Sequence, residues 1–133
     1  MISSFDDLLR LAHEQAQPQR LLFVFAAAAL PDDATPEQRA RFQAGQGGTL
    51  TPLMCVDKTP GELASFAALC EESQQFGHAW DIVFAAAISG SGGSSPTSGQ
   101  ADAPLQRMVE SIKSGGVAGF LAFDAAGQPV QLG

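Results

Sequence analysis

The sequence predicts a single α/β domain, with a mixed sheet of about five strands and helices on both of its faces. Three observations lead to this fold. Residues 82–88 are all apolar, which is typical of a strand covered on both faces. Two helix-start signals, at residues 35–38 and 59–62, each follow another apolar stretch. The last residues of the chain show the pattern of a β-hairpin.

The size and charge of the chain limit the classes of protein it can belong to. Its 133 residues are enough for one domain with a core of its own, and an apolar content of 45% argues against disorder. The chain is acidic, with a net charge of −7 and an isoelectric point near 4.5. Nucleic acid and anionic membranes are therefore poor partners, because both require clustered Lys or Arg.

The sequence also predicts a cytoplasmic protein. The longest apolar run, residues 21–30, is too short to span a membrane, and residues 1–7 lack the basic region of a signal peptide. Cys55 and Cys70 are expected to be reduced and buried thiols, which agrees with this location.

The first half of the chain is predicted to contain two helices and two strands. Ser3 or Ser4 caps a helix that ends before Pro18, and residues 21–28 form a strand. Thr35, with Pro36 next and Gln38 closing the capping box, starts a short helix. Residues 50–56 follow as a second strand. The apolar face of the first helix comprises Phe5, Leu8, Leu9, Ala12 and Ala16.

The middle of the chain is predicted to form a parallel βαβ unit. Thr59 caps a helix over residues 60–76, with Leu63, Phe66 and Cys70 on its inner face. The strand at residues 80–89 follows. A strand, a helix and a strand at this spacing favour a right-handed crossover between parallel strands.

The last third is predicted to be a loop, a helix and a hairpin. Residues 89–100 are rich in Gly and Ser and are expected to form a flexible loop. Asp102 caps a helix over residues 103–114. Residues 117–124 and 128–132 form a hairpin with Gly127 in a left-handed conformation. The predicted order is α-β-α-β-α-β-α-β-β, and an α+β fold is the alternative.

No established catalytic motif is present in the sequence. It lacks the nucleophile elbow, the phosphate-binding loop with Lys, the Cys-x-x-Cys pair and the zinc-protease helix, and it contains no tyrosine. His13 and His78 are far apart in the chain and are predicted to be exposed residues without a function. We therefore expect no cofactor.

The glycine-rich segment has two interpretations. Gly90, Gly92 and Gly93 follow a strand and precede a helix, so they could cradle a phosphate. However, Ser95 stands where the third glycine of the dinucleotide fingerprint would fall, and the segment contains neither Lys nor Arg. A flexible linker is therefore the favoured interpretation, and a phosphate site is the alternative.

A cluster of carboxylates is the other candidate site. Asp32 and Asp33 follow the first strand, and Asp57 and Lys58 follow the second. If these strands are parallel, the four side chains share one edge of the sheet, where they could hold Mg²⁺ or carry out acid–base chemistry. The alternative is that they are ordinary turn residues and residues preceding helices.

The composition favours a binding protein over an enzyme. Charged residues make up only 16% of the chain, and no catalytic constellation is visible. The predicted edge hairpin at residues 119–132 would expose a strand of the kind that pairs with a second chain. We therefore expect a non-catalytic binding or protein-interaction module that forms a homodimer or binds a protein partner.

Five segments of the chain carry a resemblance to a known family: residues 3–9, 18–26, 30–35, 50–58 and 119–124. Through them, nearly the whole chain resembles a family of small bacterial proteins that are labelled "ribonucleotide reductase subunit alpha". The resemblance implies no site residue, because the chemistry of that subunit needs a ten-stranded barrel, a larger cysteine set and tyrosines. Residues 22–24 and 53–66 carry a looser resemblance, to the N-terminal module of the enhanced-serine-sensitivity family.

Overall fold

Four helices and four strands make up the described part of the chain. The computed structural model describes residues 4–29, 33–43, 49–63, 65–75, 77, 79–90, 92–94, 96–114, 116–117 and 120–130. The strands form one sheet in the order β2-β1-β3-β4, and all neighbours are antiparallel. The elements are α1 Phe5–His13, β1 Gln19–Ala29, α2 Pro36–Gln43, β2 Thr49–Lys58, α3 Phe66–Gln74, β3 Ile82–Ser89, α4 Ser98–Lys113 and β4 Leu121–Asp124.

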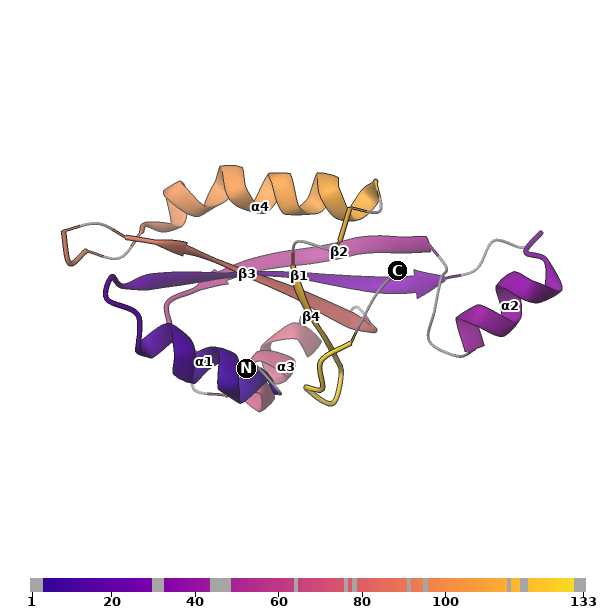
Figure 1. Ribbon diagram of the computed structural model, residues 1–133, viewed down its shortest axis with the longest axis horizontal. Coiled ribbons are helices and arrows are strands. Elements are labelled where there is room, and N and C mark those ends of the chain that lie inside the picture. Colours follow the sequence, from indigo (N-terminus) through magenta and orange to yellow (C-terminus); the bar gives the residue numbers. More distant parts are fainter. Residues whose placement is uncertain are drawn as a thin grey trace.

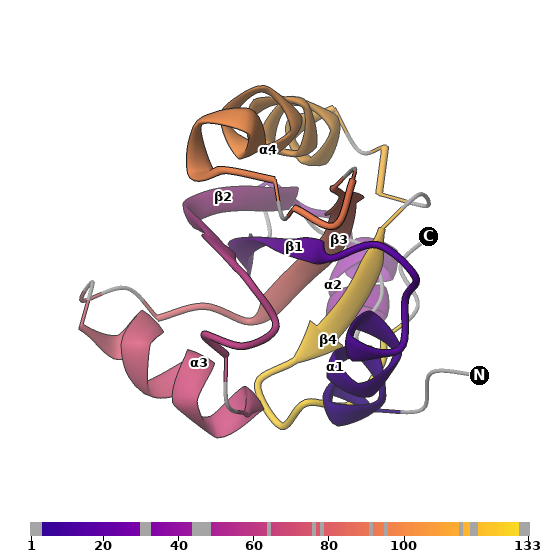
Figure 2. The same cartoon turned by 90° about the vertical axis from the view of Figure 1, so that its left-hand side faces the viewer.

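The sheet lies between two helical layers. Helix α4 covers one face, and α1 and α3 cover the other (Figures 1 and 2). The predicted helices on both faces are thus confirmed. Helix α2 lies apart from these layers, beyond the ends of β1 and β2 (Figure 1).

Strand β1 is the most deeply buried strand of the sheet. Residues 21–26 are at most 1% exposed, because their side chains alternate between two cores. Phe23 packs with Phe5 under α1 and α3, whereas Val24 packs with Leu105 under α4. The prediction that β3 is covered on both faces holds only for its first half, since residues 86–89 are half-buried or exposed.

The predicted parallel βαβ unit is wrong. Strands β2 and β3 run in the same direction, but β1 lies between them and is antiparallel to both. Local sequence patterns indicate where strands are, not which strands are neighbours, and they gave no sign that β1 would insert here. The sheet is antiparallel and four-stranded rather than mixed and five-stranded, which corresponds to the α+β alternative.

Helix α3 begins later than predicted. The Thr59–Glu62 capping bonds do form, with the Thr59 N–H donating to Glu62 Oε1 at 2.9 Å. They close only a turn, after which Leu63 inserts into the core. Ser65 then caps the helix by accepting a hydrogen bond from the Ala68 N–H. Leu69 and Ser73 are the buried residues of the helix, and Phe66 of the predicted inner face packs against the same core.

Helix α4 begins earlier than predicted. Thr97, not Asp102, is its cap, and Thr97 and Gln100 form a complete capping box. Ser89 belongs to β3 and Ser98 to α4, so the connection between them is shorter than the predicted loop of residues 89–100. Residues 98–101 are thus helical despite the Gly and Ser content before Asp102, because the capping box at Thr97 starts the helix ahead of them.

The C-terminal turn is as predicted. Gly127 has a φ of +82°, and its N–H donates to the Asp124 carbonyl at 3.0 Å. Past this turn the chain makes one bridge, Phe123 with Pro129, rather than a second full strand. Residues 131–132 of the predicted hairpin lie outside the described residues. Among the helices described, none is both long and apolar enough to cross a membrane.

Candidate functional site

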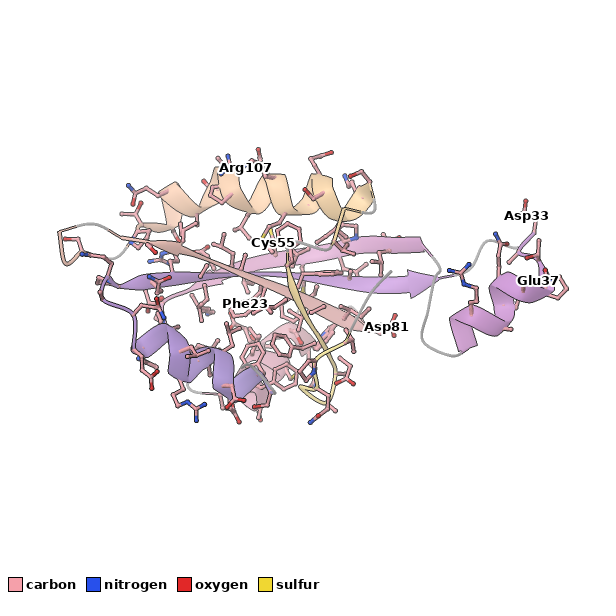
Figure 3. The ribbon with its side chains drawn as sticks, viewed as in Figure 1. Phe23, Asp33, Glu37, Cys55, Asp81 and Arg107 are labelled. Carbon is pink, nitrogen blue, oxygen red and sulfur yellow. The ribbon has the colours of Figure 1, made fainter. Side chains whose placement is uncertain are left out.

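The predicted carboxylate cluster is not brought together. Asp33 precedes α2, beyond the end of β1 (Figure 3), whereas Asp57 pairs with Leu22 near the beginning of β1. Antiparallel strands end at opposite ends of a sheet, so these two carboxylates cannot share a cation. Asp32 lies outside the described residues. Among the residues described, no three His, Cys, Asp or Glu side chains are grouped as a metal site would require.

Asp57 instead belongs to a polar network that joins three elements. Its Oδ2 accepts hydrogen bonds from Arg20 Nη1 at 2.6 Å and from Ser98 Oγ at 2.5 Å. Arg20 Nε also donates to the Pro96 carbonyl at 2.6 Å. The Arg20 and Asp57 side chains are only 13% and 18% exposed, so the network ties β1 and β2 to the start of α4.

Lys58 is held on the opposite face of the sheet. Its Nζ lies 2.9 Å from Glu72 Oε1 of α3, and its side chain is 22% exposed. The ion pair therefore joins β2 to the helix below it. Neither Lys58 nor Asp57 is free for acid–base chemistry in this arrangement.

The glycines after β3 form a tight turn against the start of β1. The Gly90 N–H donates to the Pro18 carbonyl at 2.8 Å, and the Gly93 N–H donates to Gln17 Oε1 at 3.2 Å. Gly92 and Gly93 have positive φ. A Cβ on Gly90 would lie 1.8 Å from the Ser94 carbonyl oxygen. The turn accounts for these glycines, and two of the N–H groups that a phosphate would need are already engaged.

His13 and the two cysteines belong to no group of metal-ligating side chains among the residues that the structure describes. His13 is exposed at the end of α1, and His78 lies outside the described residues. Cys55 and Cys70 are both free thiols; Cys70 is half-buried, and Cys55 is exposed rather than buried as predicted.

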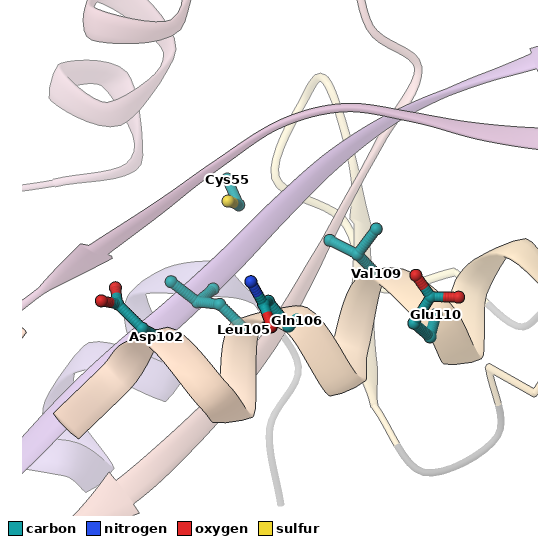
Figure 4. Close-up of a pocket in the computed structure, with 6 residues that line it drawn as sticks. All are labelled: Cys55, Asp102, Leu105, Gln106, Val109 and Glu110. Carbon is teal, nitrogen blue, oxygen red and sulfur yellow. The ribbon is translucent and has the colours of Figure 1, made fainter. Parts of the chain in front are cut away.

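The described residues do form a groove between the edge strand β2 and helix α4. It has a volume of about 490 Å³. Cys55, Leu105 and Val109 supply its apolar part, and Asp102 and Glu110 lie toward its two ends (Figure 4). Within the described part of the chain, neither carboxylate has an ion-pair or hydrogen-bond partner. The residues that line it are Cys55, Asp102, Leu105, Gln106, Val109 and Glu110.

The groove raises the pKa of the Cys55 thiol. Partial burial of the sulfur, in a residue that is exposed as a whole, is the largest cause, followed by the negative charges of Asp57 and Asp102. The sulfur is thus a neutral thiol at neutral pH, which suits a lining of apolar character and does not suit a nucleophile.

Alkylation should reveal this shift. In a Cys70→Ser variant, the rate at which iodoacetamide modifies Cys55 should rise with pH as the thiol ionises. We expect the midpoint of this rise to lie at a higher pH in the folded protein than in the same chain in denaturant, because only the folded structure disfavours the thiolate. Asp102→Asn should move the midpoint back toward the denatured value. A folded-state midpoint at or below the denatured one would contradict the assigned electrostatics.

The sequence reading missed this groove, although a signal for it was present. Asp102, Gln106, Val109 and Glu110 recur at the spacing of one helical face. The prediction of Asp102 as the cap excludes it from the helix, and therefore from this face. Cys55, on the other side of the groove, is far from this helical face in the sequence. The two meet only because α4 packs over β2, which no local pattern shows.

The chain matches no known protein-family model, no curated protein and no solved structure. The family resemblance seen in the sequence therefore stays a prediction.

Proposed function

We propose that the protein is an interaction module that binds an extended segment of a partner protein along the outer edge of β2. The observation that supports this most is that β2 is a ten-residue strand at the edge of the sheet, with a groove directly beside it. An edge strand offers a row of main-chain N–H and C=O groups, and extended segments add to such edges as a further strand.

Only part of β2 is suited to this pairing. Pro52 removes one donor, and the register with β1 shifts between Phe25 and Ala26, opposite residues 52–54. Both features protect an edge against pairing. The regular part of the strand, residues 54–58, has neither, and Cys55 of the groove lies within it.

The charges of this regular part do not prevent pairing. Charged side chains commonly protect edge strands, and β2 carries Asp57 and Lys58. Asp57 is bound to Arg20 and Ser98, and Lys58 is bound to Glu72. Both charges are therefore neutralised by contacts within the protein, and they lie above and below the sheet rather than along its edge.

The opposite edge of the sheet is less suited. Strand β4 has only four residues, and residues 129–130 already bond to Phe123 and Ala122 beside it. The C-terminal hairpin that the sequence suggested for a homodimer is thus partly occupied by its own chain. A partner segment at β2 is favoured over a second copy, because two chains of net charge −7 would bring the carboxylates of two grooves together.

Binding of defined peptides tests the proposal. We expect at least one fluorescein-labelled, acetylated peptide that alternates valine with lysine, serine or glutamate to bind in a fluorescence anisotropy titration. The same peptide with proline at alternate positions should not bind, because it has lost main-chain donors. If none of the three peptides binds, or if the proline form binds equally well, the proposal is wrong. Sedimentation over a range of protein concentrations separates this from self-association.

A further inference from the structure

We infer that the groove between β2 and α4 selects a partner segment in which two basic residues, four positions apart, flank an apolar residue. The inference rests on the proposed pairing at β2 and goes further, because it states which side chains the partner must carry. The edge of β2 would provide affinity through the main chain, and the groove would provide specificity.

A strand added to the edge of β2 would contact the groove because of where the groove lies. A strand pairing with β2 lies about 4.8 Å outside it, and its side chains point alternately to the two faces of the sheet. Cys55 faces α4, because it is paired with Val24, which belongs to the core under that helix. Every second side chain of the added strand would therefore enter the space under the flank of α4.

The centre of the groove suits an apolar side chain. Leu105 and Val109 lie on α4 and Cys55 on β2, and all three point toward the space between the two elements (Figure 4). The neutral state of the Cys55 thiol adds no charge here. The hydrogen-bonding groups offered here are the weak thiol of Cys55 and the amide of Gln106 beside it, so an apolar side chain that packs on Leu105 and Val109 gives up less hydration than a polar one.

The ends of the groove suit basic side chains. Asp102 and Glu110 lie on the same flank of α4, just over two helical turns apart, which is a rise of about 12 Å. Positions i and i+4 of a strand are about 13 Å apart and point to the same face. Two basic residues at this spacing would therefore meet the two carboxylates, with the intermediate residue i+2 at the apolar centre.

Neither basic residue three positions from Glu110 on α4, Arg107 or Lys113, forms an ion pair with it in the described part of the chain. Arg107 lies on the side of α4 away from the sheet (Figure 3), where it lines a solvent-facing hollow with Glu110. It forms no ion pair with Glu110 or Asp102 among the described residues. The overall charge of −7 adds a longer-range attraction for a basic segment.

Peptide spacing and charge provide the test. The probe is a labelled peptide with lysine at positions i and i+4, valine at i+2 and serine elsewhere. For the Asp102→Asn/Glu110→Gln variant, we expect its Kd to rise about tenfold at low salt, since each exposed pair contributes up to about fivefold. The control variant Glu14→Gln/Glu71→Gln removes the same charge from exposed sites on α3 and at the end of α1, and it should change the Kd less than about twofold. Equal melting temperatures would show that both variants are folded.

Each outcome decides for or against the inference. Two results together support the inference. The peptide with lysines at i and i+4 binds more tightly than one with lysines at i and i+2, and affinity falls in the Asp102→Asn/Glu110→Gln variant but not in the control variant. Equal binding of lysine and glutamate peptides overturns it while leaving the pairing at β2 intact. Equal loss in both double variants shows that only net charge matters and overturns it as well. If no peptide binds and the protein dimerises instead, both this inference and the proposed function fail, and a second copy is the occupant.

Discussion

Replacing Phe23 by alanine is expected to destabilise the protein by about 4 kcal/mol, the largest effect of any single substitution considered for this fold. Phe23 lies on β1 and is fully buried, and its ring stacks on that of Phe5 with a centroid separation of 5.6 Å. Phe66 and Phe123 pack on Phe5 in turn. Alanine at residue 23 would leave a cavity under α1 and α3 that neighbouring rings cannot fill without leaving their own contacts.

Urea denaturation measures this loss, and Leu121→Ala is the matched control. Leu121 also lies on a strand of the sheet but is 40% exposed, so its truncation should cost roughly 1 kcal/mol or less. In thermal unfolding, the Phe23 variant should melt about 12–16 °C below the parent protein. Similar losses in both variants would mean that β1 is not the centre of the structure.

Replacing Arg20 by methionine is expected to destabilise the protein by about 2–3 kcal/mol at neutral pH. Methionine keeps most of the aliphatic stem but removes the guanidinium, which bonds to Asp57 and to the Pro96 carbonyl. Of the hydrogen bonds to Asp57 from described residues, the one from Ser98 would then remain, in a site where the Asp57 side chain is 18% exposed. Leaving one partner of a mostly buried charge pair alone costs more than the pair itself contributes.

A double-mutant cycle isolates this cost. Asp57→Asn in the Arg20→Met background should restore part of the stability, because it removes the unpaired charge. Arg10→Met is the control: its guanidinium, 64% exposed, pairs with Asp7 on the surface and should contribute about 0.5 kcal/mol or less. If the Arg20 and Arg10 variants lose equal stability, the network does not tie β1, β2 and α4 together.

Local features of the fold could be predicted from the sequence, since they depend on residues close together in the chain. Ser4 caps α1, and Thr35 forms the capping box with Gln38 at the start of α2. Gly127 makes the left-handed turn. In each case the residue that determines the conformation lies within four residues of the backbone that it shapes, so a short stretch of sequence contains the whole interaction.

The features that the sequence did not predict depend on contacts over long distances. The insertion of β1 between β2 and β3 follows from the packing of both its faces, which no local pattern records. The strong capping signal at Thr59 is overridden because Leu63 is drawn into the core, so α3 starts at Phe66. Tertiary burial outweighs a local cap, which contributes only about 1 kcal/mol.

The candidate site likewise combines a feature set by residues close together in the sequence with one set by long-range contacts. The spacing of Asp102 and Glu110 on one helical face was visible in the sequence, but its meaning depended on β2 lying beneath that face. The carboxylates that the sequence singled out, Asp33 and Asp57, lie at opposite ends of the sheet because β1 and β2 are antiparallel. The predicted parallel direction of these two strands would have brought both carboxylates to one end of the sheet, and the antiparallel pairing separates them.

Amide hydrogen exchange along β2, with and without a bound peptide, tests the central claim most directly. In the free protein, alternate amides of residues 54–58 should exchange fast, because in an antiparallel pair only every second residue bonds to β1. At a peptide concentration of ten times the Kd, we expect these fast amides to slow by about tenfold, while those of Leu121–Asp124 stay unchanged. Protection at β4 alone, or binding of the peptide without any protection of residues 54–58, would contradict the assignment of β2 as the binding edge.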